Sequence, residues 1–142
     1  MENFQISGQY TNEYPEFMKA WGMIKLACAR ANTDVGEMTP EKLKMIEPAC
    51  QELIKGNYLD QFQVDLYQGG AGTSTNMNAN EVIANRALEI MGHPHGDYQY
   101  CHPNNHINRS QSTNDAYPTA IKVALMDAND KLLGEIHKLI AL

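Results

Sequence analysis

Apolar residues recur every three or four positions through most of this chain, and this spacing constrains the fold more than any other feature. The spacing extends over four stretches, residues 15–35, 40–55, 77–91 and about 115–142. Such a repeat is typical of amphipathic helices. No stretch alternates apolar and polar residues over a useful length, so strands are limited to a short strand or hairpin in the loops. The sequence therefore predicts an all-α fold.

Prolines and glycines mark the ends of the expected helices. Tyr14-Pro15 and Thr39-Pro40 open the first two helices, because proline suits the first turn, where its missing N–H has no partner to lose. Pro48 falls inside the second stretch, where it predicts a kink or an irregular turn. Glycines are expected to end the first three helices, at Gly36, Gly56 and Gly92.

Two long connections separate these helices. Residues 58–72 are expected to be irregular, because their glycine run cannot hold a regular element. Residues 93–112, which are rich in proline, glycine, histidine and asparagine, are expected to form a long loop. Tyr98 and Tyr100 give this loop apolar anchors, so we expect it to be ordered. A long loop in a compact domain is usually functional when it is ordered.

The last stretch, expected to start near Asp115 to Pro118, carries an apolar stripe over about five helical turns. Its members are Ile121, Leu125, Ala128, Leu132, Ile136 and Leu139. A stripe of this length needs a partner helix, so we expect homo-oligomers that assemble through the C-terminal helix. The pattern stops at Ala141-Leu142 without a capping signal, and we therefore expect the sequence to be truncated.

The composition argues against several classes of partner. The formal net charge is −6 and the basic residues are scattered, which argues against nucleic acid, since binding it needs clustered Lys and Arg. No apolar run is long enough to span a bilayer, and no signal peptide is visible, so no membrane partner is expected. Cys28, Cys50 and Cys101 are odd in number and far apart, which indicates buried thiols and a cytoplasmic location.

Metal binding is also not expected. The histidines at 93, 95, 102 and 106 lie in a stretch broken by prolines, not on a helix that would present an i, i+4 pair as in a zinc protease. No acidic cluster or cysteine pair completes a coordination shell. Loop histidines without such partners are usually solvated.

Two dense clusters of hydroxyl and amide side chains stand just before the third and fourth helices, at residues 72–76 and 110–115. A helix N-terminus has unpaired N–H groups and a partial positive charge, which make it a natural anion site. Neither cluster matches a nucleotide-binding motif, because no lysine follows the glycine run. Ordinary helix capping and a carboxylate-binding site both account for these residues, and no catalytic triad is readable.

Residues 60–82 and 102–115 resemble the two signature regions of the aspartase/fumarase superfamily, in the family's order and at a similar separation. The stretch from Glu2-Asn3-Phe4 onward is also similar, so the resemblance covers essentially the whole chain. The segments Gln-Gly-Gly-Ala-Gly-Thr and Ser-Thr-Asn-Asp resemble the corresponding motifs of the aspartases. Class II fumarases read more like Gln-Thr-Gly-Ser-Gly-Thr and Ser-Ser-Asn-Asp.

This resemblance implies a fold and an assembly. Residues 1–112 would form the N-terminal helical lyase domain, and residues 113–142 would begin the first long helix of the central bundle. Members of the superfamily build each active site from three subunits of a tetramer. Met1 would then be a cloning start, since the segment that normally precedes Glu2 is missing.

The resemblance also implies a reaction, the elimination of ammonium from L-aspartate to give fumarate, without metal or organic cofactor. Carried over by motif position, Thr73, Ser112 and Thr113 would hold the β-carboxylate, and Asn114 would contact the substrate amine or carboxylate region. The segment with His102, Asn104 and Asn105 matches a secondary anion site of related fumarases.

The catalytic base of the family is a serine on a mobile Gly-Ser-Ser loop, and no such motif occurs in these 142 residues. We therefore expect no catalytic residue here and an inactive isolated chain. Two alternatives to the aspartase reading are a class II fumarate hydratase and a non-catalytic oligomerisation or binding module.

Overall fold

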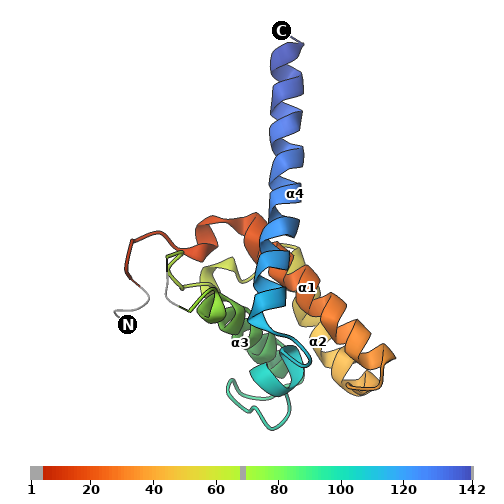
Figure 1. Ribbon diagram of the computed structural model, residues 1–142. Coiled ribbons are helices and arrows are strands. Elements are labelled where there is room, and N and C mark those ends of the chain that lie inside the picture. Colours follow the sequence, from red (N-terminus) through yellow and green to blue (C-terminus); the bar gives the residue numbers. More distant parts are fainter. Residues whose placement is uncertain (1–4, 68–69, 142) are drawn as a thin grey trace.

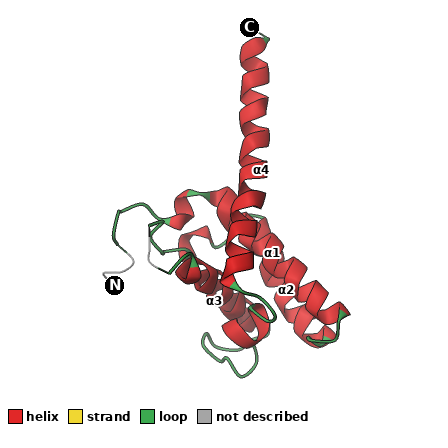
Figure 2. Cartoon of the chain, in the orientation of Figure 1, coloured by secondary structure: helices red, strands yellow, loops and turns green. Residues whose placement is uncertain are grey.

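The computed structural model describes residues 5–67 and 70–141. Within these residues the chain folds into four α helices: α1 (Pro15–Asp34), α2 (Pro40–Ile54), α3 (Thr73–Ile90) and α4 (Thr113–Ile140). The short helices are η2 (Thr11–Glu13), η3 (Leu59–Gln61) and η4 (Pro103–Ile107). Figures 1 and 2 show this helical arrangement, with no strand in the described part and one isolated bridge between Tyr10 and Asp65. The prediction of an all-α fold is confirmed.

The core forms where α1 packs against α2 on one side and α4 on another. Trp21 and Met18 on α1 are fully buried, and so are Ile46 and Leu53 on α2. Burying side chains of this size contributes roughly 2 kcal/mol each, and this burial holds the three helices together. The quoted segments Glu2-Asn3-Phe4 and Gln68-Gly69 lie outside the described residues.

Helix α2 runs without interruption through Pro48, so the expectation of an irregular turn there was wrong, while the alternative of a kink stays a prediction. Proline removes only one backbone hydrogen bond, the one its N–H would give to the carbonyl four residues earlier. The neighbouring turns are held by burial of Ile46 and Cys50. The N-cap was predicted correctly, since the Thr39 hydroxyl accepts the N–H of Lys42 at 3.3 Å.

The connection over residues 93–112 is ordered, but part of it is helical rather than loop. The five residues of η4 form a π-helical turn. His102 nucleates this turn, because its Nδ1 accepts the backbone N–H groups of Asn104 at 3.0 Å and Asn105 at 3.3 Å. Side-chain capping of this kind is not visible in a hydrophobic pattern, and the sequence therefore gave no sign of it.

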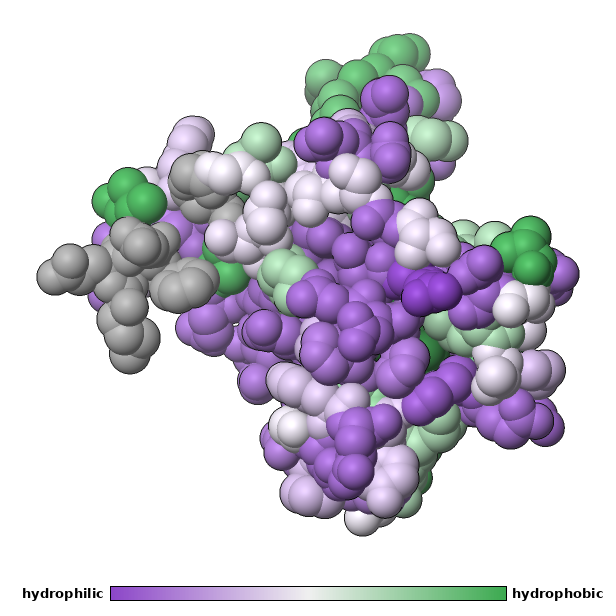
Figure 3. Space-filling view, turned by 60° about the horizontal axis from the view of Figure 1, so that its bottom comes forward, coloured by the Kyte–Doolittle hydropathy of each residue, from purple (hydrophilic) through white to green (hydrophobic). Residues whose placement is uncertain are grey.

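Helix α4 begins at Thr113, earlier than the expected start near residues 115–118. The Ser112 hydroxyl caps it by accepting the N–H of Asn114 at 3.2 Å, and Pro118 lies inside the helix. Only Ala116 and Ala120 of this helix are buried, and its C-terminal half projects away from the other helices (Figure 1). Hydrophobic residues gather on the projecting end (Figure 3).

Four members of the apolar stripe show this exposure: Leu125 is 62% exposed, Leu132 58%, Ile136 39% and Leu139 70%. The division of the chain into units 1–112 and 113–142 stays a prediction. None of the helices described is long and apolar enough to cross a membrane.

Candidate functional site

The two polar clusters of the sequence meet at one place, because α3 and α4 begin side by side. Gly72 takes a left-handed conformation with φ of 86°, and the Tyr117 ring of α4 lies directly against it. A Cβ added to Gly72 would lie 2.4 Å from Cδ2 of that ring, so only glycine fits. This close approach sets the start of α3 against the first turns of α4.

A hydrogen bond between side chains joins the two helix starts. Asn76, fully buried in the first turns of α3, donates from Nδ2 to Oγ1 of Thr113, the first residue of α4, at 3.1 Å. Thr75 beside it is also buried. Residues 73–76 therefore form the first turn of the helix rather than a cap that precedes it.

A buried lysine lies beneath this contact. Lys25 comes from the middle of α1 and is fully buried, although it stands on a predominantly apolar helix. Its ammonium group donates to three amide oxygens: Oδ1 of Asn76 at 2.6 Å, Oε1 of Gln111 at 2.8 Å and Oδ1 of Asn108 at 3.0 Å. Lysine has three N–H donors, and all three are used.

The amides around Lys25 fix the segment that leads into α4. Asn108 Oδ1 accepts a second hydrogen bond, from Asn76 Nδ2 at 3.1 Å, while its own Nδ2 donates to the Gln111 carbonyl at 3.2 Å. Gln111 Nε2 donates to the carbonyl of Ile107 at 2.8 Å. These bonds hold residues 107–111, in which Ser110 takes a positive φ of 59°. The position of the α4 N-terminus thus depends on the buried amides.

Burial lowers the pKa of Lys25 to about 8, because the protein interior disfavours the charged form. Ion pairs among the described residues do not include this lysine. The nearest titratable groups are thiols: burial raises the pKa of Cys28, and that of Cys50 to about 12, so both stay neutral. The ammonium group is therefore stabilised by the three amide oxygens and by the Trp21 ring, whose centroid lies 5.3 Å from Nζ.

The substrate-binding residues expected from the resemblance lie mostly at the start of α4. Ser112 and Asn114 are exposed and Thr113 is half-buried. Hydroxyl, amide and helix N-terminal N–H groups converge there, which is the donor set that a carboxylate prefers. This exposed edge of the α3–α4 junction is the candidate site.

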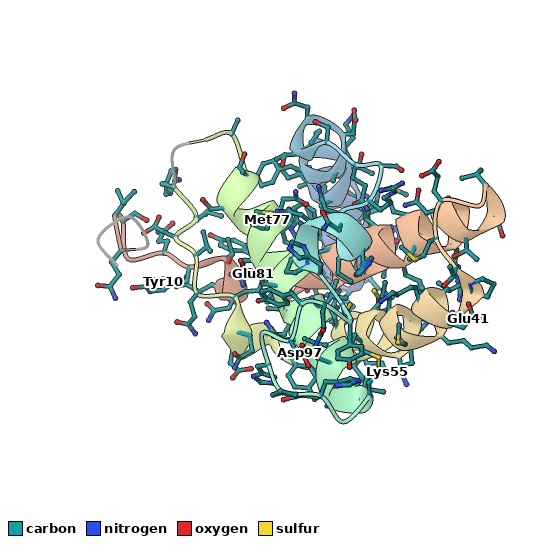
Figure 4. The ribbon with its side chains drawn as sticks, turned by 90° about the horizontal axis from the view of Figure 1, so that it is seen from below. Tyr10, Glu41, Lys55, Met77, Glu81 and Asp97 are labelled. Carbon is teal, nitrogen blue, oxygen red and sulfur yellow. The ribbon has the colours of Figure 1, made fainter. Side chains whose placement is uncertain are left out.

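Thr73, at the start of α3, lines a hollow that the residues at the start of α4 do not line. Its side chain is exposed, and its hydroxyl donates to the Gly70 carbonyl at 2.7 Å. It lines a hollow between α3 and the N-terminal segment, together with Met77, Glu81 and Tyr10 (Figure 4). The Thr73 hydroxyl would have to rotate before it could donate to a carboxylate, and its predicted role stays a prediction.

The residues of the expected secondary anion site, His102, Asn104 and Asn105, all lie at the start of η4. The two backbone N–H groups there already donate to Nδ1 of His102, so the donors left for an anion are the exposed amide side chains of the asparagines and the Nε2–H of His102. His106 closes the turn by accepting the His102 N–H at 2.8 Å, and burial lowers its pKa. An anion site at this turn stays a prediction.

Among residues 5–67 and 70–141, no group of three or more His, Cys, Asp or Glu side chains is arranged to hold a metal ion. The histidines of the long connection have other contacts. The ring of His93 stacks on Tyr100 with 3.8 Å between centroids, and His95 Nε2 lies 2.5 Å from Glu89 Oε1.

Sequence reasoning missed Lys25, Asn108 and Gln111. One signal was available: Lys25 follows Trp21 by four positions and precedes Cys28 by three, so it stands on the apolar face of its helix. A charged residue in such a place is either paired or surrounded by polar groups.

A family profile described as lyase matches residues 1–142. The chain belongs to this lyase family. The superfamily resemblance of the two motifs is thereby confirmed. This lyase chain is 52% identical over 140 residues to aspartate ammonia-lyase of Pseudomonas fluorescens, and 55% identical over 139 residues to that of Helicobacter pylori.

These matches cover 99% and 97% of the chain, which spans 29% and 30% of those relatives. A solved structure described as fumarate lyase:delta crystallin from Brucella melitensis superposes with a TM-score of 0.96 at 50% identity. That match covers 99% of this chain and 33% of the other. The fold is therefore that of the N-terminal part of the family, and the chain spans less than a third of the relatives' length.

Proposed function

We propose that this chain is part of an enzyme that converts L-aspartate to fumarate and ammonium. The observation that carries this proposal is the identity of about half, across nearly the whole chain, to proteins curated as aspartate ammonia-lyases. The reaction would remove a proton from Cβ, move charge onto the adjacent carboxylate and expel the amine. Its transition state carries a doubly charged carboxylate, which needs strong donors.

The start of α4 would supply those donors. Ser112 and Thr113 would donate to the β-carboxylate and Asn114 would contact the amine or the second carboxylate, with Thr73 joining from α3. Neutral hydroxyls at a helix N-terminus favour the more highly charged transition state over the substrate, which is what accelerates a reaction. The base would come from outside these 142 residues.

The direct test is an assay of the full-length protein with L-aspartate and with L-malate, followed by the ultraviolet absorbance of fumarate. We expect fumarate from aspartate at least about 10²-fold faster than from malate. The reverse preference would identify a hydratase, and no product from either would favour a non-catalytic binding module. The isolated 142-residue chain should be inactive. Fumarate formation by that chain would contradict the proposal that the catalytic base lies outside these 142 residues.

We further infer that the enzyme is a homo-oligomer that associates through α4. The apolar side chains on its projecting half would otherwise face water, and each buried leucine would contribute roughly 2 kcal/mol. In a tetramer, neighbouring subunits would contribute further residues to the site. The three cysteines are free thiols, which suits a reducing cytoplasm.

A further inference from the structure

The proposed reaction gives no role to Lys25. Its burial is nevertheless hard to explain by protein stability alone. Placing an ammonium group in the interior costs several kcal/mol unless its hydrogen bonds are fully satisfied. A methionine of similar length would fill the same space without that cost. The cation is nevertheless buried on α1, directly beneath the start of α4.

The chemistry of lysine determines how the Asn76 amide is turned. An ammonium group only donates, so the atom of Asn76 that faces Lys25 at 2.6 Å must be the oxygen. The NH₂ group must then face Thr113 and Asn108. Asn108 Oδ1 favours the same orientation, since it accepts from Asn76 Nδ2 at 3.1 Å, so Lys25 and Asn108 together set how the amide is turned.

The orientation of Asn76 determines in turn what Thr113 can do. Its Oγ1 accepts a hydrogen bond from Asn76 Nδ2, so the single hydroxyl proton of Thr113 does not point back at Asn76. That proton is left for another acceptor, and a substrate carboxylate at the exposed side of the helix start would be one. Consecutive hydrogen bonds also polarise one another, so the buried cation strengthens the outer donor.

We propose that Lys25 is a positioning residue, which through Asn76 sets the Thr113 hydroxyl as a donor toward the substrate carboxylate. The proposal rests on the function proposed above. It adds a part of α1 to a site otherwise built from the starts of α3 and α4. Lys25 also places a full positive charge two hydrogen bonds behind the donor, where a dicarboxylate would feel it without displacing it.

The sharpest test is Asn76→Asp in the full-length protein. The introduced carboxylate keeps its contact with Lys25, but its second oxygen can only accept, so it turns the Thr113 proton inward. The new ion pair should offset the repulsion between that oxygen and Asn108 Oδ1, so the variant should fold, which its thermal midpoint measured beside the parent's checks. We expect kcat/KM for aspartate to fall by about 10²-fold, mostly in kcat, as when one oxyanion donor is lost.

Asn85→Asp is the matched control, since Asn85 lies on the same helix and bonds to Glu81 and Gly96 instead. It should change kcat/KM less than about threefold. A second pair is Lys25→Met against Lys44→Met, because Lys44 is exposed on α2. We expect loss of kcat only for Lys25→Met. If Asn76→Asp is folded and fully active, the proposal is wrong.

Neutron diffraction from crystals of the full-length protein gives a readout independent of activity. We expect three deuterons on Nζ of Lys25 and a Thr113 deuteron that points away from Asn76. A deuteron on Thr113 that donates to Asn76 would overturn the proposal. A parent without any aspartate activity would instead overturn the proposed function, while the neutron result still decides the arrangement around Lys25.

Discussion

The ring of Tyr117 on α4 covers Gly72 at the start of α3 so closely that a Cβ at Gly72 would lie 2.4 Å from its Cδ2. This contact and the hydrogen bond from Asn76 to Thr113 both join the two helix starts. The geometry of the candidate site therefore depends on packing between helices as much as on the residues that would touch a substrate.

Gly72→Ala should destabilise the protein by about 3 kcal/mol. A left-handed φ costs a non-glycine residue roughly 1 kcal/mol, and forcing a methyl group against the ring adds about 2. Gly92→Ala is the control: its φ is 77°, but open space surrounds its Cβ position, so only about 1 kcal/mol is expected. Urea unfolding of both variants measures the difference, and equal losses would show that the ring contact is unimportant.

Thr113→Val should lower kcat/KM for aspartate by about 10²-fold in the full-length enzyme, because it removes one donor at nearly constant volume. Thr119→Val on the same helix serves as the control, since its exposed hydroxyl bonds only to the Asp115 carbonyl at 2.6 Å. Steady-state kinetics with aspartate measure kcat/KM of the two variants. Unchanged kcat/KM in Thr113→Val would remove this residue from the site.

Lys25 should give stability an unusual pH dependence. Its folded pKa of about 8 lies below the unfolded value near 10.5, so the folded state loses its proton first as pH rises. Between these two values the unfolded state binds more protons, and stability therefore rises with pH. The rise from this residue is on the order of 3 kcal/mol at most.

Urea unfolding at pH 7, 9 and 10 (about one to two units either side of the folded pKa) should show this rise in the parent relative to Lys25→Met. The same titration works against function, because a neutral amine has two N–H groups for three amide oxygens. Parallel stability profiles for parent and variant would indicate that the lysine stays charged throughout.

The Asp65 carboxylate should act as a clamp, in that its hydrogen bonds hold the N-terminal segment until strong acid protonates it. Although desolvation opposes ionisation, hydrogen bonds from Ser7, Gly8 and Tyr67 outweigh it and lower the pKa of Asp65 to about 2. The stability it contributes is present above its unfolded pKa of about 3.8 and is lost as pH falls toward 2.

Asp65→Asn should loosen residues 7–10, because an amide brings donors where backbone N–H groups already point. Hydrogen exchange of Ser7 and Tyr67 should become faster in this variant. The exposed Asp60→Asn is the control and should leave exchange unchanged. Equal protection in both variants would mean that the clamp is not needed.

The 142-residue chain should self-associate through the projecting half of α4. Light scattering should show oligomers whose mass falls when Leu132 is replaced by glutamate, since a charge on the apolar stripe opposes its burial. Gly134→Glu adds the same charge on the opposite side of the helix, where nothing lies within 4 Å of its Cβ position, and should leave the mass unchanged. A monomer at high concentration would count against association through this helix.

The sequence by itself determined the four main helices and the polar residues that stand at the starts of two of them. Apolar spacing of three to four and the cap at Thr39 depend on residues close together in the chain, so they can be read locally. The same holds for the polar clusters at the starts of α3 and α4. Local reading was least accurate at residues 103–107, where a His102 cap made a turn that no periodicity shows.

Only the tertiary structure decided how those parts meet. Lys25 bonds to residues 51, 83 and 86 positions away, and nothing in the neighbouring sequence indicates that three amides will surround it. The meeting of Gly72 with Tyr117 is likewise a result of packing. A buried cation is stable only when donors and acceptors from several segments converge on it, and that convergence exists only after the chain has folded.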